Sequence, residues 1–149
     1  MKNKNYIQSV CSIRKNEIIV DGKTIIHTET SNFLDFAKIA YNDIGTNYPK
    51  FFKMDNLSKL AFIGAEILLK DVVDLSNNNI VLLFSNKSSS LDTDMRYQKS
   101  IAEKDNYYPS PSVFVYTLPN ICLGEISIRH QLKSENSFLY LTRLIRHLW

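Results

Sequence analysis

Cys122 and His130 are the side chains of this sequence whose types most suggest nucleophilic catalysis. A thiol becomes a strong nucleophile when an imidazole within hydrogen-bonding distance removes its proton. The apolar pattern, however, predicts that both residues lie in one helix over 118–132, where eight residues of helix separate them by about 12 Å along the axis. They cannot hydrogen-bond within that helix. Cys122 is therefore expected to be a packed thiol, since free cysteine behaves mostly as a small buried hydrophobe.

Two carboxylates in the stretch "SLDTD", Asp92 and Asp94, could bind a divalent cation. Oxygen-ligated cation sites need several further ligands, and no third carboxylate is placed beside these two. Carboxylates at the start of a helix also stabilise it by facing the positive end of its dipole. Helix capping is therefore the preferred interpretation, no metal is expected, and the isolated His27 at a strand end is given no role.

Several enzyme classes are excluded by what the sequence lacks. Its four glycines, at positions 22, 45, 64 and 124, cannot form a dinucleotide-binding G-x-G-x-x-G turn or a phosphate-binding loop. No serine lies in a G-x-S-x-G elbow, and no cysteine or histidine spacing is that of a zinc site. No cofactor is expected. The net charge of +3 is dispersed along the chain, which argues against nucleic acid as a partner.

The composition, 44% hydrophobic and 22% charged over 149 residues, is that of one globular domain spanning 1–149. The start, "MKNKNYIQSVCSIRK", is expected not to be an export signal, because polar residues interrupt it before any apolar run. No stretch approaches the roughly 20 apolar residues that cross a bilayer. A cytoplasmic protein with reduced Cys11 and Cys122 is expected.

The first half of the chain predicts strands followed by two helices. A strand is expected over 6–13, and a hairpin over 17–26 with a type I′ turn at Asp21 and Gly22. Ser31 or Asn32 is expected to cap an amphipathic helix. Asp55 is expected to cap a second helix that is apolar on nearly every side and hence buried all round.

The second half predicts a strand over 79–84, whose unbroken apolar run suits burial on both faces. A polar loop is expected to lead into a short helix near 95–101, and "YYPSPS" to form another loop. The helix over 118–132 is expected to carry a surface ion pair between Glu125 and Arg129. Strands and helices alternating in this way predict a layered α/β fold.

The segment over 110–141 resembles the part of β-ketoacyl synthases that precedes their catalytic nucleophile. Three features occur in the family's order and spacing: a Ser-Pro loop, an Asn-containing helix with a central small residue, and a Leu-Lys turn before a strand. The matching residues are Ser110, Pro111, Asn120, Gly124, Leu132, Lys133 and Ser137. Segments 48–69 and 81–101 resemble the family's buried helix, core strand and following loop. The nearest likeness is to ketosynthase-like proteins of aryl-polyene and flexirubin-type pigment clusters.

This resemblance implies a thiolase-like half domain, the N-terminal half of a ketosynthase fold, with a mixed sheet and one buried central helix. Leu144 occupies the place of the family's nucleophilic cysteine, and Ser134 and Glu135 replace its Gly-Pro turn. The family's two catalytic histidines belong to a second half that has no counterpart over 1–149. A thioester cannot be activated without these groups, so a non-catalytic protein is expected.

The last residues predict an interaction surface. Through Tyr140 the chain resembles the strand that lies at the subunit interface of family dimers, and from Leu141 the apolar spacing becomes helical. That apolar face needs a cover, which is the chain's own sheet, a partner subunit or a membrane surface. The interface candidates are Ser137, Phe138, Leu139, Tyr140, Leu141, Leu144, Ile145, Leu148 and Trp149.

The expected function is a non-catalytic ketosynthase-like subunit. Its expected partner is a β-ketoacyl synthase or an acyl carrier protein of fatty-acid or polyene-type biosynthesis, or a second copy of the chain. Whether residues 88–94 contact a carrier protein stays open. The alternatives are an independent small enzyme that uses Cys122, His130 or the Asp92 and Asp94 pair, and a truncated remnant of a condensing enzyme.

Overall fold

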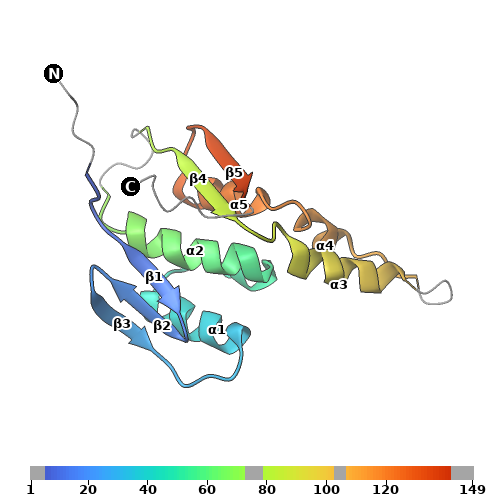
Figure 1. Ribbon diagram of the computed structural model, residues 1–149, viewed down its shortest axis with the longest axis horizontal. Coiled ribbons are helices and arrows are strands. Elements are labelled where there is room, and N and C mark those ends of the chain that lie inside the picture. The colour runs from blue at the N-terminus through green and yellow to red at the C-terminus, as the bar shows by residue number, and fades with distance from the viewer. Residues whose placement is uncertain (1–5, 73–78, 103–106, 142–149) are drawn as a thin grey trace. The chain divides into compact units, whose positions relative to one another are not determined.

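The computed structural model describes residues 6–72, 79–102 and 107–141 (Figure 1). The chain divides into two compact units. The first comprises Met1–Asn47 and Ile63–Val73, and the second comprises Tyr48–Phe62 and Asp74–Trp149. No helix within the described ranges is long and apolar enough to cross a bilayer.

The first unit contains an antiparallel sheet in the order β1 (Cys11–Arg14), β2 (Glu17–Val20), β3 (Lys23–His27). The predicted Asp-Gly hairpin is confirmed, because Asp21 and Gly22 have positive φ angles of 49° and 81° and join β2 to β3. The predicted strand over 6–13 is wrong at its start. Ile7 and Val10 are exposed there, and regular pairing begins at Cys11.

Helix α1 (Phe33–Ile44) completes the first unit with the C-terminal half of α2 (Asn56–Leu69). Asn32 is the predicted N-cap, and its side chain accepts a hydrogen bond from the Asp35 amide at 3.0 Å. Phe36, Ala37 and Ala40 on the predicted apolar face are buried. The core of this unit also contains Ile18, Ile26, Tyr41 and Ile63.

The second unit contains the 3-10 helix η1 (Pro49–Lys53), the first half of α2, and a parallel pair of strands, β4 (Leu82–Asn86) and β5 (Asn136–Tyr140). Helices α3 (Leu91–Ile101), α4 (Pro111–Val115) and α5 (Ile121–His130) connect the two strands. Its core is apolar and partly aromatic, with Phe51, Met54, Phe62, Leu82, Tyr116, Cys122, Leu123, Ile126 and Leu132 buried.

The α/β class is confirmed, whereas the described strands form two sheets instead of one mixed sheet. The helix predicted over 118–132 is shorter, because the chain turns through Leu118–Asn120 and Gln131 ends α5 in the left-handed region with φ 55°. The predicted loop "YYPSPS" is wrong in its second half. Ser110 instead begins α4 by accepting a hydrogen bond from the Val113 amide. The short helix predicted near 95–101 begins earlier, at Leu91.

Helix α2 differs most from expectation, because it is not buried all round. Leu60 and Leu68 are 39% and 41% exposed, whereas the charged residues Lys59 and Glu66 are buried. Lys59 Nζ donates a hydrogen bond to the carbonyl oxygen of Met54, and Glu66 accepts one from Thr46 Oγ1 at 2.5 Å. Partners of this kind allow a charged side chain to occupy an interior position.

Candidate interaction surface on the parallel strand pair

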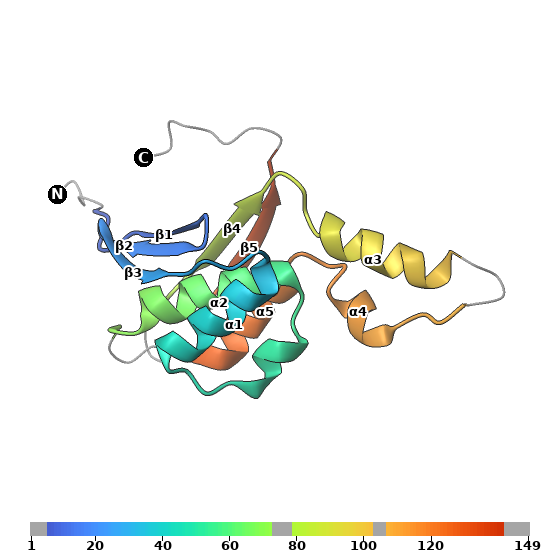
Figure 2. The same ribbon diagram turned by 90° about the horizontal axis from the view of Figure 1, so that it is seen from below.

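The two parallel strands of the second unit lie side by side in both views (Figures 1 and 2). Leu82 pairs with Asn136 and Phe84 with Phe138, and the register continues to the end of β5. Parallel strands need a long crossover, which α3, α4 and α5 provide here. The site is therefore assembled from segments about fifty residues apart in the sequence.

One face of this pair is covered. Side chains alternate between the faces of a strand, so Leu82, Phe84 and Phe138 point to one side. Leu82 is 8% exposed, Phe84 and Phe138 are half-buried, and α5 contacts β5. The apolar side of α5, with Leu123 and Ile126 fully buried, provides interior packing for this unit.

The opposite face, here called the outer face, carries Leu83, Ser85, Ser137 and Leu139. Leu83 is 65% exposed and Leu139 43% exposed. The prediction that the strand over 79–84 is covered on both faces is therefore wrong. The strand also begins at Leu82, because Val81 before it is 58% exposed and outside regular pairing.

A two-stranded parallel sheet with an apolar exposed face is unusual for an isolated unit. Parallel sheets occur almost only with both faces covered, and two strands alone are marginally stable. Each strand also has an outer edge without a ladder partner within the described residues. An open strand edge offers unpaired amides and carbonyls to a further strand. The outer face and its edges are consequently the candidate interaction surface.

The predicted interface residues divide at Tyr140. Ser137, Phe138, Leu139 and Tyr140 lie in β5, which confirms the predicted strand and its last residue. The Leu141 amide donates to the Asn86 carbonyl at 3.0 Å and continues the ladder with β4. The helical spacing predicted from Leu141 falls on 142–149, outside the described residues, and stays a prediction. The remaining candidates, Leu144, Ile145, Leu148 and Trp149, lie outside the described residues.

A buried polar cluster lies at the start of α2 in the same unit. Asp55 is 3% exposed, and its Oδ1 accepts the Ser58 amide at 2.9 Å, which confirms the predicted N-cap. Its Oδ2 also accepts a hydrogen bond from Thr93 Oγ1 of α3 at 2.7 Å. Asn56 donates to Asp92 at 2.9 Å beside it. These side chains join the starts of α2 and α3.

Glu125 belongs to a second buried polar group and not to the predicted surface pair with Arg129. Its side chain is 5% exposed, with Oε2 2.9 Å from Lys50 Nζ. Tyr116 donates its hydroxyl to Oε1 at 3.0 Å, and burial followed by this carboxylate raises the tyrosine pKa. Arg129 instead lies over the Tyr48 ring at 5.6 Å. Two partners for Glu125 offset the cost of burying its charge.

The thiol of Cys122 is packed, as predicted. It is 1% exposed, and its Sγ donates to the Pro119 carbonyl at 3.1 Å. Burial, followed by the charge of Asp55, raises the Cys122 pKa to about 12. At neutral pH it is therefore a protonated thiol and a poor nucleophile. His130 is the last residue of the same helix.

Asp92 and Asp94 lie in the first turn of α3, as the capping interpretation predicts. The Ser90 hydroxyl lies within donating distance of two acceptors, Asp94 Oδ1 at 3.1 Å and the Thr117 carbonyl oxygen at 2.5 Å. Across 6–72, 79–102 and 107–141, no group of three or more His, Cys, Asp or Glu side chains is placed to hold a metal ion.

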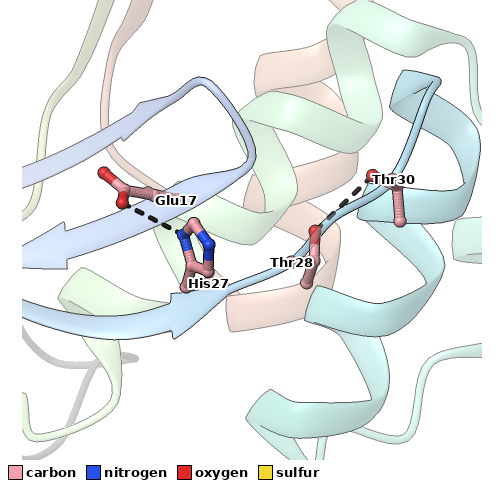
Figure 3. A network of polar contacts seen from close by, with 4 residues as sticks. All are labelled: Glu17, His27, Thr28 and Thr30. Carbon is pink, nitrogen blue, oxygen red and sulfur yellow. Dashed lines mark hydrogen bonds and ion pairs between the residues drawn. The ribbon is translucent and has the colours of Figure 1, made fainter.

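His27 is part of a small polar group at the edge of the first unit (Figure 3). Its Nδ1 is 3.0 Å from Glu17 Oε1, and the two residues are paired across β2 and β3. Their side chains are 57% and 35% exposed, so the pair contributes little to stability. Thr28 and Thr30 form a separate contact at 3.5 Å in the segment that follows. We therefore assign these contacts of His27, Thr28 and Thr30 a structural role.

Sequence reasoning did not find the second role of Asp55 or the burial of Glu125. Asp55 meets Thr93 across 38 residues, and Glu125 meets Lys50, which belongs to a different helix. An Asp before a helix and a Glu four residues before an Arg are signals of local interactions. Asp55 has a distant partner in addition to its local one, and Glu125 has distant partners in place of the predicted one. No protein-family model matches this chain, and no curated protein matches it significantly.

Proposed function

We propose that this chain is a non-catalytic, ketosynthase-like subunit that uses the outer face and edges of the β4–β5 pair to bind a component of acyl-chain synthesis. The partner is a β-ketoacyl synthase or an acyl carrier protein of fatty-acid or polyene-type biosynthesis in the cytoplasm. The resemblance of 110–141 to the synthases supplies this partner class. The protein's own contribution is to bind and position, with no covalent step.

The observation that carries the proposal is the exposed apolar face of a parallel strand pair. Leu83 and Leu139 are 65% and 43% exposed on strands of a kind that is normally covered on both faces. Burial of such side chains contributes about 25 cal/mol for each Å² of apolar surface removed from water. An added strand would also satisfy the open backbone groups, so both terms favour a protein partner.

The state of Cys122 supports a binding role over an independent enzyme. A catalytic thiol needs a lowered pKa and access to substrate, whereas this one is buried with its pKa raised to about 12. Asp92 and Asp94 are engaged at the start of α3 by Asn56 and Ser90. The side chains considered for an enzyme thus have structural partners instead of facing a shared substrate site.

The test is quantitative capture of partners from the native cell with a tagged chain. The variant Leu83→Glu combined with Leu139→Glu places charge on the outer face at exposed positions, so the fold should persist. Ile128→Glu is the matched control, because Ile128 is 65% exposed on α5 of the same unit. Circular dichroism verifies folding of each protein before capture.

The wild type and Ile128→Glu should recover a ketosynthase or an acyl carrier protein in stoichiometric amount, and the double variant should lose most of it. Capture of no acyl-synthesis component by the folded wild type contradicts the proposal. So does condensing activity of the purified chain alone, because a binding subunit has no nucleophile for that reaction.

A further inference from the structure

Helix α3 has an exposed stripe opposite the side that packs within its unit. Leu91, Met95 and Gln98 follow at spacings of four and three residues, which places them on one face of a helix. Leu91 is 53% exposed and Met95 56% exposed. On the packed side, Thr93 is buried and the Tyr97 ring lies 5.3 Å from that of Phe114 in α4. Figure 2 shows α3 and α4 next to each other.

The exposed stripe is hollowed at its centre. Asp94, Met95, Gln98 and Lys99 line a shallow, open depression around the Met95 side chain. Methionine is flexible and polarizable, and it is common at surfaces that adapt to another chain. The depression therefore has an apolar floor with one carboxylate and one ammonium group along its sides.

The two charges are arranged as in a parallel pair of helices. With Leu91 and Met95 at successive core positions of a heptad, Asp94 lies on one flank of the stripe and Lys99, five residues later, on the other. In a parallel two-helix pairing, a residue on one flank of the first helix faces the residue five positions later on the opposite flank of the second helix. Asp94 then meets Lys99 of the second copy, twice by symmetry.

An antiparallel pairing of the same stripe is less favourable. There the Asp94 flank of one helix meets the Asp94 flank of the other, and like charges repel. Asp92 lies on the Lys99 flank and would face Lys99 of the partner, but it already accepts a hydrogen bond from Asn56 at 2.9 Å. The charge pattern thus favours one occupant, a second copy of this chain, and the parallel orientation leaves the Asn56–Asp92 hydrogen bond intact. A partner with an unrelated helix would need its own matching charges.

We propose that α3 is a self-association surface, through which two copies pair in parallel about Met95 with reciprocal Asp94–Lys99 ion pairs. This inference does not depend on the proposed function, which uses the β4–β5 surface. The helix has 11 residues and a glutamine at one core position, so the contact is small. Small contacts with exposed ion pairs give weak, concentration-dependent association that salt reduces further.

Sedimentation equilibrium of the whole chain over a range of concentrations tests the surface. The wild type should show a reversible monomer–dimer equilibrium, and Met95→Glu should be monomeric throughout. Leu34→Glu is the matched control, because Leu34 is 57% exposed on α1, and it should dimerise like the wild type. Equal behaviour of Met95→Glu and the wild type overturns the proposal, and so does a wild type that stays monomeric.

A charge exchange tests orientation. Asp94→Lys and Lys99→Asp should each weaken the dimer about tenfold, because two attractive pairs become repulsive. An equimolar mixture of the two variants should regain wild-type affinity as a heterodimer, since both reciprocal pairs are then attractive. Lys38→Asp on exposed α1 is the control for net charge. Failure of the mixture to recover contradicts parallel pairing.

Asp94 also has a structural contact with Ser90, so Asp94→Lys can weaken α3 itself. Circular dichroism of each variant identifies that effect. Lys99→Asp and Met95→Glu leave the Ser90–Asp94 contact unchanged, so their effects on dimerisation test the proposal without it. Capture of an acyl-synthesis partner should be unchanged in Lys99→Asp, which separates this surface from the β4–β5 surface.

Discussion

The three antiparallel strands of the first unit and the two parallel strands of the second differ in how far along the chain each finds its partner. β1, β2 and β3 are joined by two-residue turns, at Lys15–Asn16 and Asp21–Gly22, whose residues all have positive φ. β4 and β5 pair only after three helices have been placed between them. Local turns complete the first sheet, whereas the second is left with an exposed apolar face.

Most of these polar interactions follow the same division, although Glu66 of the first unit is also buried and accepts from Thr46. In the first unit, Asp21 accepts from Ser9 and Val10 at the surface, and its pKa is lowered chiefly by the Val10 amide. In the second unit, Asp55 and Glu125 are buried with distant partners. Removing a buried partner costs more than removing an exposed one, so substitutions should distinguish the two units by size.

The largest effect is expected for Asp55→Ala. The change removes the cap of α2 and leaves the Ser58 amide and Thr93 hydroxyl without their acceptor in a buried place. We expect a loss of about 3 kcal/mol in the free energy of unfolding. Urea denaturation measures it. Asp35→Ala, which removes an exposed first-turn carboxylate of α1, should cost about 0.5 kcal/mol. Equal losses would remove the proposed contrast.

A smaller effect is expected from alkaline pH through Cys122. Its pKa is raised from 9.0 to about 12 in the folded chain, so the folded state keeps the proton longer. Stability from this group is complete below pH 9 and is lost as pH rises towards 12. By pH 10 the loss is about 1 kcal/mol.

Urea denaturation at pH 7 and pH 10 checks the alkaline effect. Cys122→Ala should lower stability at pH 7 but show a smaller further loss at pH 10 than the wild type, because the titrating thiol is gone. Cys11→Ala is the comparison in the first unit: burial and then Asp21 also raise the pKa of this half-buried thiol, but less than that of Cys122, so its removal should reduce the alkaline loss less. An unchanged loss in Cys122→Ala would contradict this assignment.

The smallest expected effects concern two glycines and have opposite signs. Gly22→Ala should destabilise by about 1 kcal/mol, because a φ of +81° is unfavourable for alanine. No steric clash adds to this cost, since no atom lies within 4 Å of the added methyl. Gly124→Ala, in helix α5 with equal space, should stabilise by about 0.5 to 1 kcal/mol. Thermal unfolding measures both. A Gly22→Ala variant as stable as the wild type would show that turn geometry does not limit the hairpin, and a destabilised Gly124→Ala would contradict the helix-propensity argument.

Local signals explain what the sequence predicts well. The Asp-Gly turn, the Asn32 and Asp55 caps and the end of β5 at Tyr140 depend on residues within a few positions of each other. The pattern also predicts Cys122 as a packed thiol, since its neighbours in the helix are apolar. Such features can be read from the sequence because the contacts that form them are short in range.

Long-range contacts explain the errors. Burial of Lys59 depends on the Met54 carbonyl and the Phe51 ring, and burial of Glu125 depends on Lys50 and Tyr116. The apolar run before Phe84 predicted full burial, but Leu83 has no cover among the described residues. Hydrophobicity identifies a strand that needs a cover, and tertiary structure decides whether the chain provides it.

The most direct test of the account is hydrogen–deuterium exchange of the captured complex against the chain alone. If a partner covers the outer face and edges of the strand pair, amides in 82–86 and 136–141 should become protected on binding, while those of β1, β2 and β3 stay unchanged. Protection of the antiparallel strands with unaltered exchange in β4 and β5 would contradict the account.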